Sequence, residues 1–65
     1  MVIVAGHINV EPQQRETYLA VSLPVVERAG GAPGSLDFAI SADLIDLGRI
    51  NIFERWESPA AVEAF

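Results

Sequence analysis

The sequence predicts one small α+β domain, in which an antiparallel sheet carries two helices on one face. Three short runs have the β-branched or alternating apolar composition of strands, and one longer run has apolar residues at helical spacing. Clusters of glycine and proline separate these runs. Because 65 residues can form only one domain, residues 1–65 are expected to fold as a single unit.

The first predicted strand covers residues 2–10. Val2, Val4, Ile8 and Val10 share one face with Gly6, and the other face also begins with apolar residues before reaching His7 and Asn9. Apolar side chains on both faces indicate a strand that is covered on both sides.

A helix is predicted over residues 12–28. Pro12 suits the first helical position, and Glu11 and Glu16 suit the positive end of the helix dipole. Pro24 removes one backbone hydrogen bond, so we expect a kink there or a break near Leu23. The expected apolar stripe consists of Leu19, Leu23 and Val26, flanked by Tyr18, Val25 and Ala29, with Gln13, Gln14, Arg15 and Glu27 facing water.

Two further strands, residues 35–42 and 49–57, are joined by a predicted hairpin loop over residues 43–48. In the first, Leu36, Phe38 and Ile40 share the apolar face. In the second, Ile50, Ile52, Glu54 and Trp56 share one face, and Arg49, Asn51, Phe53 and Arg55 share the other.

Ser58 and Pro59 mark the start of a second helix that continues to residue 65. The order strand, helix, strand, strand, helix is the ferredoxin-like pattern without its final strand. That strand would pair with residues 2–10, so we expect an unguarded apolar edge. The expectation is that the protein continues beyond residue 65, or that another chain supplies a strand.

Composition narrows the classes of function. There is no cysteine, which excludes disulfides and thiolate chemistry, and a single histidine cannot build a zinc site. The net charge of −5 disfavours nucleic acid and anionic membranes as partners. The apolar first ten residues lack the features of a signal peptide or a membrane span, so the expected location is the cytoplasm. A small, cysteine-free and 51% apolar chain is expected to gain stability as a homodimer.

Three segments resemble the antibiotic biosynthesis monooxygenase domain: VIVAGHINV, PGSLDF and above all RINIFERWESPAAVEAF. The resemblance covers essentially the whole chain. It implies a dimeric α+β barrel in which two sheets pack face to face, with a ligand cavity between each sheet and its helices. It also implies cofactor-independent oxidation of a phenol, quinol or polyketide-type substrate.

Cofactor-free oxygenation needs a base and donors that hold the substrate anion in a dry cavity. His7 is the natural base, because histidine is the residue type that titrates near neutral pH. We expect it to point into the cavity between sheet and helices, with Val2, Val4, Ile8 and Val10 facing the partner. The alternative is a histidine with a purely structural role.

Four residues are candidates for substrate binding: Arg49, Asn51, Phe53 and Trp56. Arg49 and Asn51 could hydrogen-bond a substrate oxygen, although an arginine at a strand end is also commonly paired with a carboxylate such as Asp46. Phe53 is either cavity wall or core. Trp56 is alternatively a packing anchor with its indole N–H satisfied.

Tyr18 and Glu54 are weaker candidates, expected to be core and a cross-strand ion pair with the neighbouring arginines, respectively. The haem-degrading branch of the family has an asparagine and a tryptophan where this chain has His7 and Phe65, which argues against haem breakdown. No metal or cofactor is predicted. The two functional hypotheses are therefore a cofactor-independent monooxygenase and a non-catalytic ligand-binding or structural homodimer.

Overall fold

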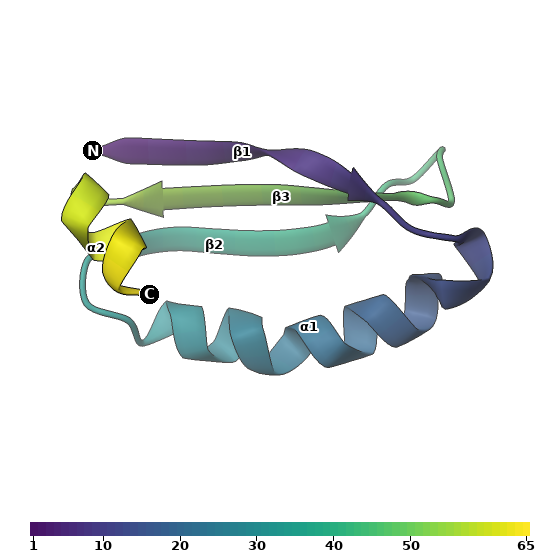
Figure 1. The fold of residues 1–65 in the computed structure, drawn as a ribbon, viewed down its shortest axis with the longest axis horizontal. Coiled ribbons are helices and arrows are strands. Elements are labelled where there is room, and N and C mark those ends of the chain that lie inside the picture. Colours follow the sequence, from purple (N-terminus) through teal and green to yellow (C-terminus); the bar gives the residue numbers. More distant parts are fainter.

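A computed structural model describes residues 1–65 and contains three strands and two helices (Figure 1). The strands are β1 (Val2–Asn9), β2 (Ser35–Ala42) and β3 (Arg49–Trp56). A short 3-10 turn η1 (Pro12–Gln14) leads into helix α1 (Arg15–Gly30), and helix α2 (Pro59–Ala64) ends the chain. Neither helix has the length and apolar character that crossing a bilayer requires.

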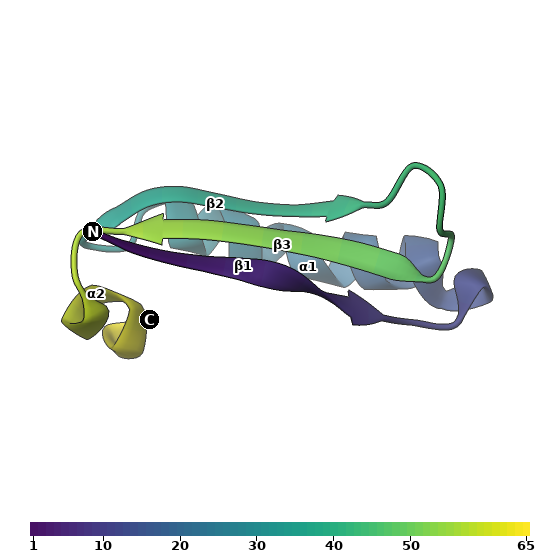
Figure 2. The same cartoon turned by 90° about the horizontal axis from the view of Figure 1, so that it is seen from above.

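The strands form one antiparallel sheet in the order β1-β3-β2. Seen from the two directions of Figures 1 and 2, α1 and α2 lie on the same side of this sheet. The predicted α+β, ferredoxin-like arrangement without a final strand is therefore confirmed. β1 is an edge strand, because only β3 pairs with it.

The cross-strand register decides which side chains meet the helices. Ile50 and Trp56 of β3 are fully buried, and their partners on β1 are Ile8 and Val2. Directly paired residues share a face of the sheet. The helix-covered face consists of Val2, Val4, Gly6 and Ile8 of β1, Phe38, Ile40 and Ala42 of β2, and Ile50, Ile52, Glu54 and Trp56 of β3.

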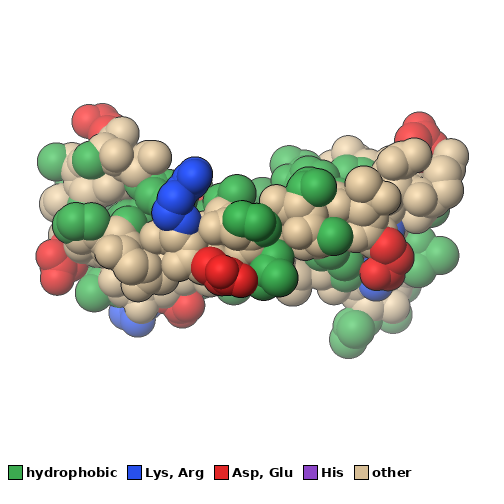
Figure 3. All heavy atoms as spheres, turned by 90° about the horizontal axis from the view of Figure 1, so that it is seen from below, with side chains coloured by type: hydrophobic (Ala, Val, Ile, Leu, Met, Phe, Trp, Pro, Cys, Tyr) green, Lys and Arg blue, Asp and Glu red, His purple; other side chains and the backbone are tan.

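The other face carries no helix and is called the open face below. It consists of Ile3, Ala5, His7 and Asn9 of β1, Asp37, Ala39 and Ser41 of β2, and Arg49, Asn51, Phe53 and Arg55 of β3. Figure 3 views the molecule from the side of α1, and no histidine is visible from there.

Trp56 anchors the core under the helices. Its ring lies 6.5 Å from that of Phe38 in an edge-to-face arrangement and 5.6 Å from that of Phe65 at the end of α2. Aromatic pairs of this kind add about 0.5–1.5 kcal/mol beyond the burial of their apolar area. This packing fits the alternative interpretation of Trp56, that of a packing anchor.

Helix α1 presents a slightly different stripe to the sheet from the predicted one. Ser22 and Ala29 are buried, whereas Leu23 is 57% exposed, so the placement of Leu23 in the stripe was wrong. The Ser22 hydroxyl donates to the carbonyl of Tyr18 at 2.8 Å, which satisfies its hydrogen-bonding need at a buried position. Apolar side chains such as Val21 and Leu23 are left on the outer side of the helix, where Figure 3 shows apolar and charged groups intermixed.

Pro24 does not break α1, which continues from Arg15 to Gly30, so the alternative of a break near Leu23 was wrong. The predicted strand at 35–42 has the observed bounds. However, the register shifts between Ser35 and Asp37, and the intervening Leu36 is left exposed and does not extend the apolar face.

The turn between α1 and β2 packs against α2 at Gly34. This glycine has a φ of 83°, and a Cβ atom added to it would lie 2.6 Å from the Cβ of Ala61. Its carbonyl also accepts a 2.8 Å hydrogen bond from the amide of Glu57. Both the conformation and the close approach therefore require glycine.

Candidate functional site

His7 lies on the open face, and the prediction that it points into a cavity between sheet and helices was wrong. Its partner across β1 and β3 is Asn51, which in turn pairs with Ser41 of β2. Because Ile50 and Trp56 are buried under the helices, their neighbours in sequence on β3 must face the other way. The expectation that Val2, Val4 and Ile8 face a partner molecule was wrong for the same reason.

The polar row His7–Asn51–Ser41 runs across the middle of the open face. The next row towards the other end of the sheet is Ala5–Phe53–Ala39. Phe53 is 38% exposed, so it belongs to the surface of the open face and is not core. A row of polar groups therefore lies beside an apolar strip that contains one accessible aromatic ring.

Arg49 and Asn51 are held by the carboxylate of Asp43, at the end of β2. The Asn51 amide nitrogen donates to Asp43 Oδ1 at 3.0 Å, and Arg49 Nε donates to Asn51 Oδ1 at 2.7 Å. Arg49 Nε is also 3.9 Å from Asp43 Oδ1, so the carboxylate paired with Arg49 is Asp43 and not Asp46. These contacts fix both side chains at the hairpin end of the open face.

The same carboxylate organises the hairpin loop. Asp43 Oδ2 accepts hydrogen bonds from the backbone amides of Ile45, at 3.0 Å, and Asp46, at 2.8 Å. The Asp46 amide, the Asn51 side chain and the Ile45 amide lower the pKa of Asp43 from 3.8 to about 2. Arg15 at the start of α1 donates to the Asp43 carbonyl at 3.1 Å, which connects the loop to the helix. The prediction that the Arg15 side chain faces water was therefore wrong.

Trp56 lies apart from the other predicted site residues, on the helix-covered face. Its indole N–H donates to Glu54 Oε1 at 2.9 Å, and it is fully buried. Glu54 therefore accepts a hydrogen bond from the tryptophan and forms no salt bridge. The predicted ion pair between Glu54 and a neighbouring arginine was wrong. The structure brings together His7, Arg49, Asn51 and Phe53 on one face, and it separates Trp56 from them.

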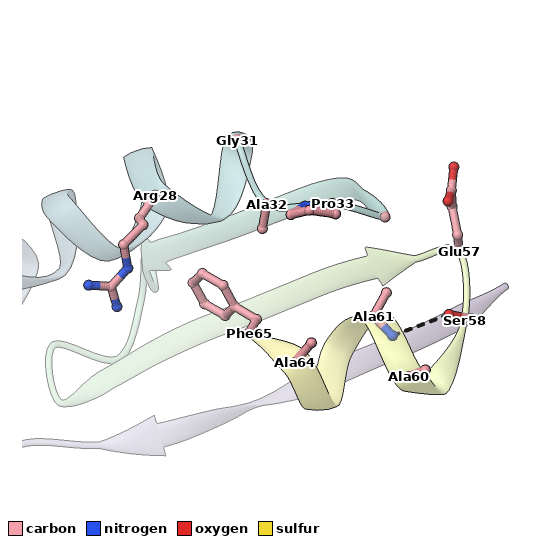
Figure 4. A pocket seen from close by; sticks show the side chains of 11 residues that line it. Arg28, Gly31, Ala32, Pro33, Glu57, Ser58, Ala60, Ala61, Ala64 and Phe65 are labelled. Carbon is pink, nitrogen blue, oxygen red and sulfur yellow. Dashed lines mark hydrogen bonds between the residues drawn. The ribbon is translucent and has the colours of Figure 1, made fainter.

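A hollow of about 610 Å³ lies on the helix side, between the end of α1, the turn before β2 and helix α2 (Figure 4). Arg28 and Phe65 face it, with the guanidinium carbon of Arg28 5.7 Å from the centre of the Phe65 ring. The Ser58 hydroxyl on its wall already caps α2 by accepting from the amide of Ala61 at 3.2 Å. None of the predicted site residues lines this hollow.

The open face places the His7 imidazole, the Asn51 amide, the Arg49 guanidinium and the Phe53 ring on one surface. Asn51 has two amide N–H groups, of which Asp43 takes one. Arg49 has five N–H donors, of which one is used by Asn51. No group of three or more histidine, aspartate or glutamate side chains is close enough to hold a metal ion.

Two residues of this region, Ser41 and Asp43, are not among the predicted site residues. Ser41 lies on the open face of β2, and nothing in its own sequence surroundings distinguishes it. Asp43 could have been found from its place at the start of a hairpin loop, because aspartate commonly accepts hydrogen bonds from backbone amides two or three residues later.

Comparison with known proteins gives a family match over the whole chain. The family model described as antibiotic biosynthesis monooxygenase matches residues 1–65. An uncharacterized protein from Synechocystis sp. is 29% identical over 62 residues, which cover 95% of this chain and 42% of that protein. The chain thus spans less than half the length of this curated relative. No solved structure matches the chain.

Proposed function

Because this chain belongs to the antibiotic biosynthesis monooxygenase family, we propose that it oxidises an aromatic phenol, quinol or polyketide-type substrate without a cofactor. The observation that carries the proposal is the pair of adjacent rows on the open face, His7–Asn51–Ser41 and Ala5–Phe53–Ala39. An aromatic ring stacked on Phe53 would bring its hydroxyl group within reach of the polar row.

In the proposed reaction, His7 removes a proton from the bound substrate. The free amide N–H of Asn51 and the free guanidinium N–H groups of Arg49 stabilise the resulting anion. The electron-rich anion then reduces oxygen itself. For an anthrone-type substrate, a ring CH2 group and O2 give a ring carbonyl and water, so the substrate supplies all the electrons.

The proposed site needs a cover, because His7 and Phe53 are exposed in the single chain and water would quench a reactive anion. We propose that a second copy of the chain covers the open face in a homodimer. The chain has no cysteine and buries only 4 of its 65 residues, so it gains much of its stability from such a contact. A cytoplasmic location completes the proposal, and imaging of the tagged full-length protein tests it.

Oxygen uptake with a panel of hydroquinones and anthrones tests the activity. The proposal expects substrate-dependent uptake that falls at least about a hundredfold in His7→Gln, in the range that a general base contributes. Asn9→Ala is the matched control, since Asn9 lies on the same face and strand but outside the two rows. Absence of uptake across the panel by a dimeric sample, or equal uptake by His7→Gln, contradicts the proposal.

The second candidate function is a ligand-binding or structural homodimer without catalysis. Two observations favour it: Asp43 already holds Asn51 and Arg49, and no hydrogen bond orients the His7 imidazole. A catalytic histidine is usually oriented by a third group. Tight binding of hydroquinones without oxygen uptake, unchanged in His7→Gln, would select this function.

A further inference from the structure

A chain of hydrogen bonds from Asp43 through Asn51 to Arg49 sets the polarity of the hairpin end of the open face. The Asn51 amide nitrogen donates to Asp43 Oδ1 at 3.0 Å, and the Asn51 amide oxygen accepts from Arg49 Nε at 2.7 Å. A carboxylate can only accept hydrogen bonds, and a guanidinium can only donate them. The Asn51 amide therefore has one permitted orientation, with its nitrogen towards Asp43 and its oxygen towards Arg49.

Asp43 is the fixed end of this chain. Its second oxygen, Oδ2, accepts from the amides of Ile45 at 3.0 Å and Asp46 at 2.8 Å, so the carboxylate cannot turn away from Asn51 without breaking both bonds. The Asp46 amide, the Asn51 side chain and the Ile45 amide lower the pKa of Asp43 to about 2. Asp43 therefore remains an acceptor throughout the neutral pH range.

The groups that this chain leaves free for a ligand are mainly donors. They are the second N–H of the Asn51 amide and the guanidinium N–H groups of Arg49 other than Nε. The Arg49 side chain is 42% exposed and the Asp43 side chain is 24% exposed, so a ligand reaches the guanidinium more readily than the carboxylate.

The two residues that flank Asn51 across the sheet, His7 and Ser41, have no fixed polarity. A neutral imidazole has one donor and one acceptor nitrogen, and a hydroxyl can donate or accept. Both side chains can therefore adapt to a ligand. Selection between a ligand that accepts and a ligand that donates is left to Asn51 and Arg49.

We propose that Asp43 is a positioning residue that sets the specificity of the open-face site: by orienting Asn51, it makes the site select aromatic ligands with an anionic oxygen over those with a donor in the same place. The inference deepens the proposed function and rests on the open face as its ligand site. It concerns binding, so it does not depend on the oxidation step.

Two matched probes test this selection. Pentafluorophenol is acidic enough to bind as a phenolate at neutral pH, and pentafluoroaniline has nearly the same shape but carries donors. Fluorine nuclear magnetic resonance titration measures both dissociation constants. We expect wild type to bind the phenolate at least about tenfold more tightly, because a charge-assisted hydrogen bond replaces a contact between two donors. Equal binding of the two probes by wild type overturns the proposal, whatever any variant does.

Asp43→Asn separates positioning from a general effect on charge. The loop amides of Ile45 and Asp46 require an acceptor, so the introduced amide turns its oxygen to them and its nitrogen to Asn51. Asn51 must then turn its own oxygen towards position 43 and release Arg49. Removal of a carboxylate would by itself favour an anionic ligand.

We therefore expect Asp43→Asn to lower the preference for the phenolate at least about fivefold, with pentafluoroaniline bound no more weakly than by wild type. Circular dichroism checks that the variant is folded. An unchanged preference, or an equal loss of affinity for both probes, overturns the proposal.

Asp46→Asn is the matched control. Asp46 Oδ1 accepts from the Gly48 amide at 2.9 Å in the same loop, and its side chain contacts neither Asn51 nor Arg49. The substitution removes the same charge, and the preference should stay within about threefold of wild type. The same fall in preference as in Asp43→Asn would assign the effect to the loop as a whole and overturn the proposal.

A second measurement needs no variant. Saturation of wild type with pentafluorophenol should shift the side-chain amide signals of Asn51, and unchanged signals overturn the proposal. The outcomes also separate this inference from the proposed function. Selection of the phenolate that responds to Asp43→Asn, without oxygen uptake from any phenol, supports the inference and contradicts the oxidation. Shifts of the Trp56 indole signal in place of the His7 signals would put the probe on the helix-covered face and overturn both.

Discussion

His7 lies directly across from Asn51 in the β1–β3 pair, on the face of the sheet that no helix covers. Asn51 is in turn held by Asp43, so the position opposite the histidine is structurally defined. The Phe53 ring occupies the next position of β3 on the same face.

Phe53→Ala is expected to weaken the binding of a hydroquinone roughly three- to tenfold, as loss of an aromatic stacking partner does. It should change the free energy of unfolding of the single chain only slightly, because Phe53 is partly exposed. Calorimetric titration measures the binding affinity, and chemical denaturation measures the free energy of unfolding. Val21→Ala is the matched control, and equal binding by the two variants would place the ligand elsewhere.

Acid should destabilise the protein through Asp43. Its pKa is about 2 in the folded chain against 3.8 for the ordinary carboxyl, so the unfolded chain binds more protons between these values. Stability is therefore fully present above about pH 4 and is lost as the pH falls towards 2. Asp43→Asn should flatten this part of the profile, measured by denaturation at a series of pH values. A profile identical to that of wild type would show that the carboxylate is not held as described.

Gly34→Ala is expected to destabilise the fold by about 1–3 kcal/mol, because the positive φ and the close approach to Ala61 both exclude a Cβ atom. Gly6→Ala is the control. Gly6 has open space around it, and alanine there should be neutral or stabilising by up to about 1 kcal/mol. Equal losses of stability in the two variants would argue against the packing of α2 on the turn.

Trp56→Ala should cost about 3–5 kcal/mol, as truncation of a buried aromatic does, and in a domain of this size that can prevent folding. Trp56→Phe is the more informative variant, because it keeps an aromatic ring but leaves Glu54 without its donor. We expect it to cost about 1–3 kcal/mol. A double variant with Glu54→Leu, which removes the acceptor, separates the hydrogen bond from the packing. Absence of coupling between the two positions would exclude the bond.

The order of the elements could be predicted from alternation, helical spacing and the punctuation by glycine and proline. Which face of β1 meets the helices could not be predicted, because both faces are apolar: Val2, Val4 and Ile8 lie on one and Ile3 and Ala5 on the other. The orientation of β1 is decided only by its pairing with β3, in which Ile50 and Trp56 are buried. The strand-level grouping of Arg49, Asn51 and Phe53 was correct, because a period of two is a local property.

The buried face of α1 and the hydrogen bonds of Asp43 both depend on tertiary packing, which the local sequence pattern does not specify. A rotation of α1 by one residue exchanges Leu23 for Ser22, and the hydroxyl is tolerated because the carbonyl of Tyr18 accepts its hydrogen bond. The Asp43 network exists only once the hairpin has closed and brought Asn51 beside the carboxylate. Both features therefore depend on tertiary contacts, which a local sequence pattern does not specify.

A nuclear magnetic resonance titration with an anthrone or hydroquinone tests the location of the site most directly. The chain has one histidine and one tryptophan, so the imidazole signals of His7 and the indole N–H signal of Trp56 need no further assignment. The two side chains report on opposite faces of the sheet. We expect saturable shifts of the His7 signals while the Trp56 signal stays in place. Shifts of the Trp56 signal with unchanged His7 signals would move the site to the helix side and contradict the account.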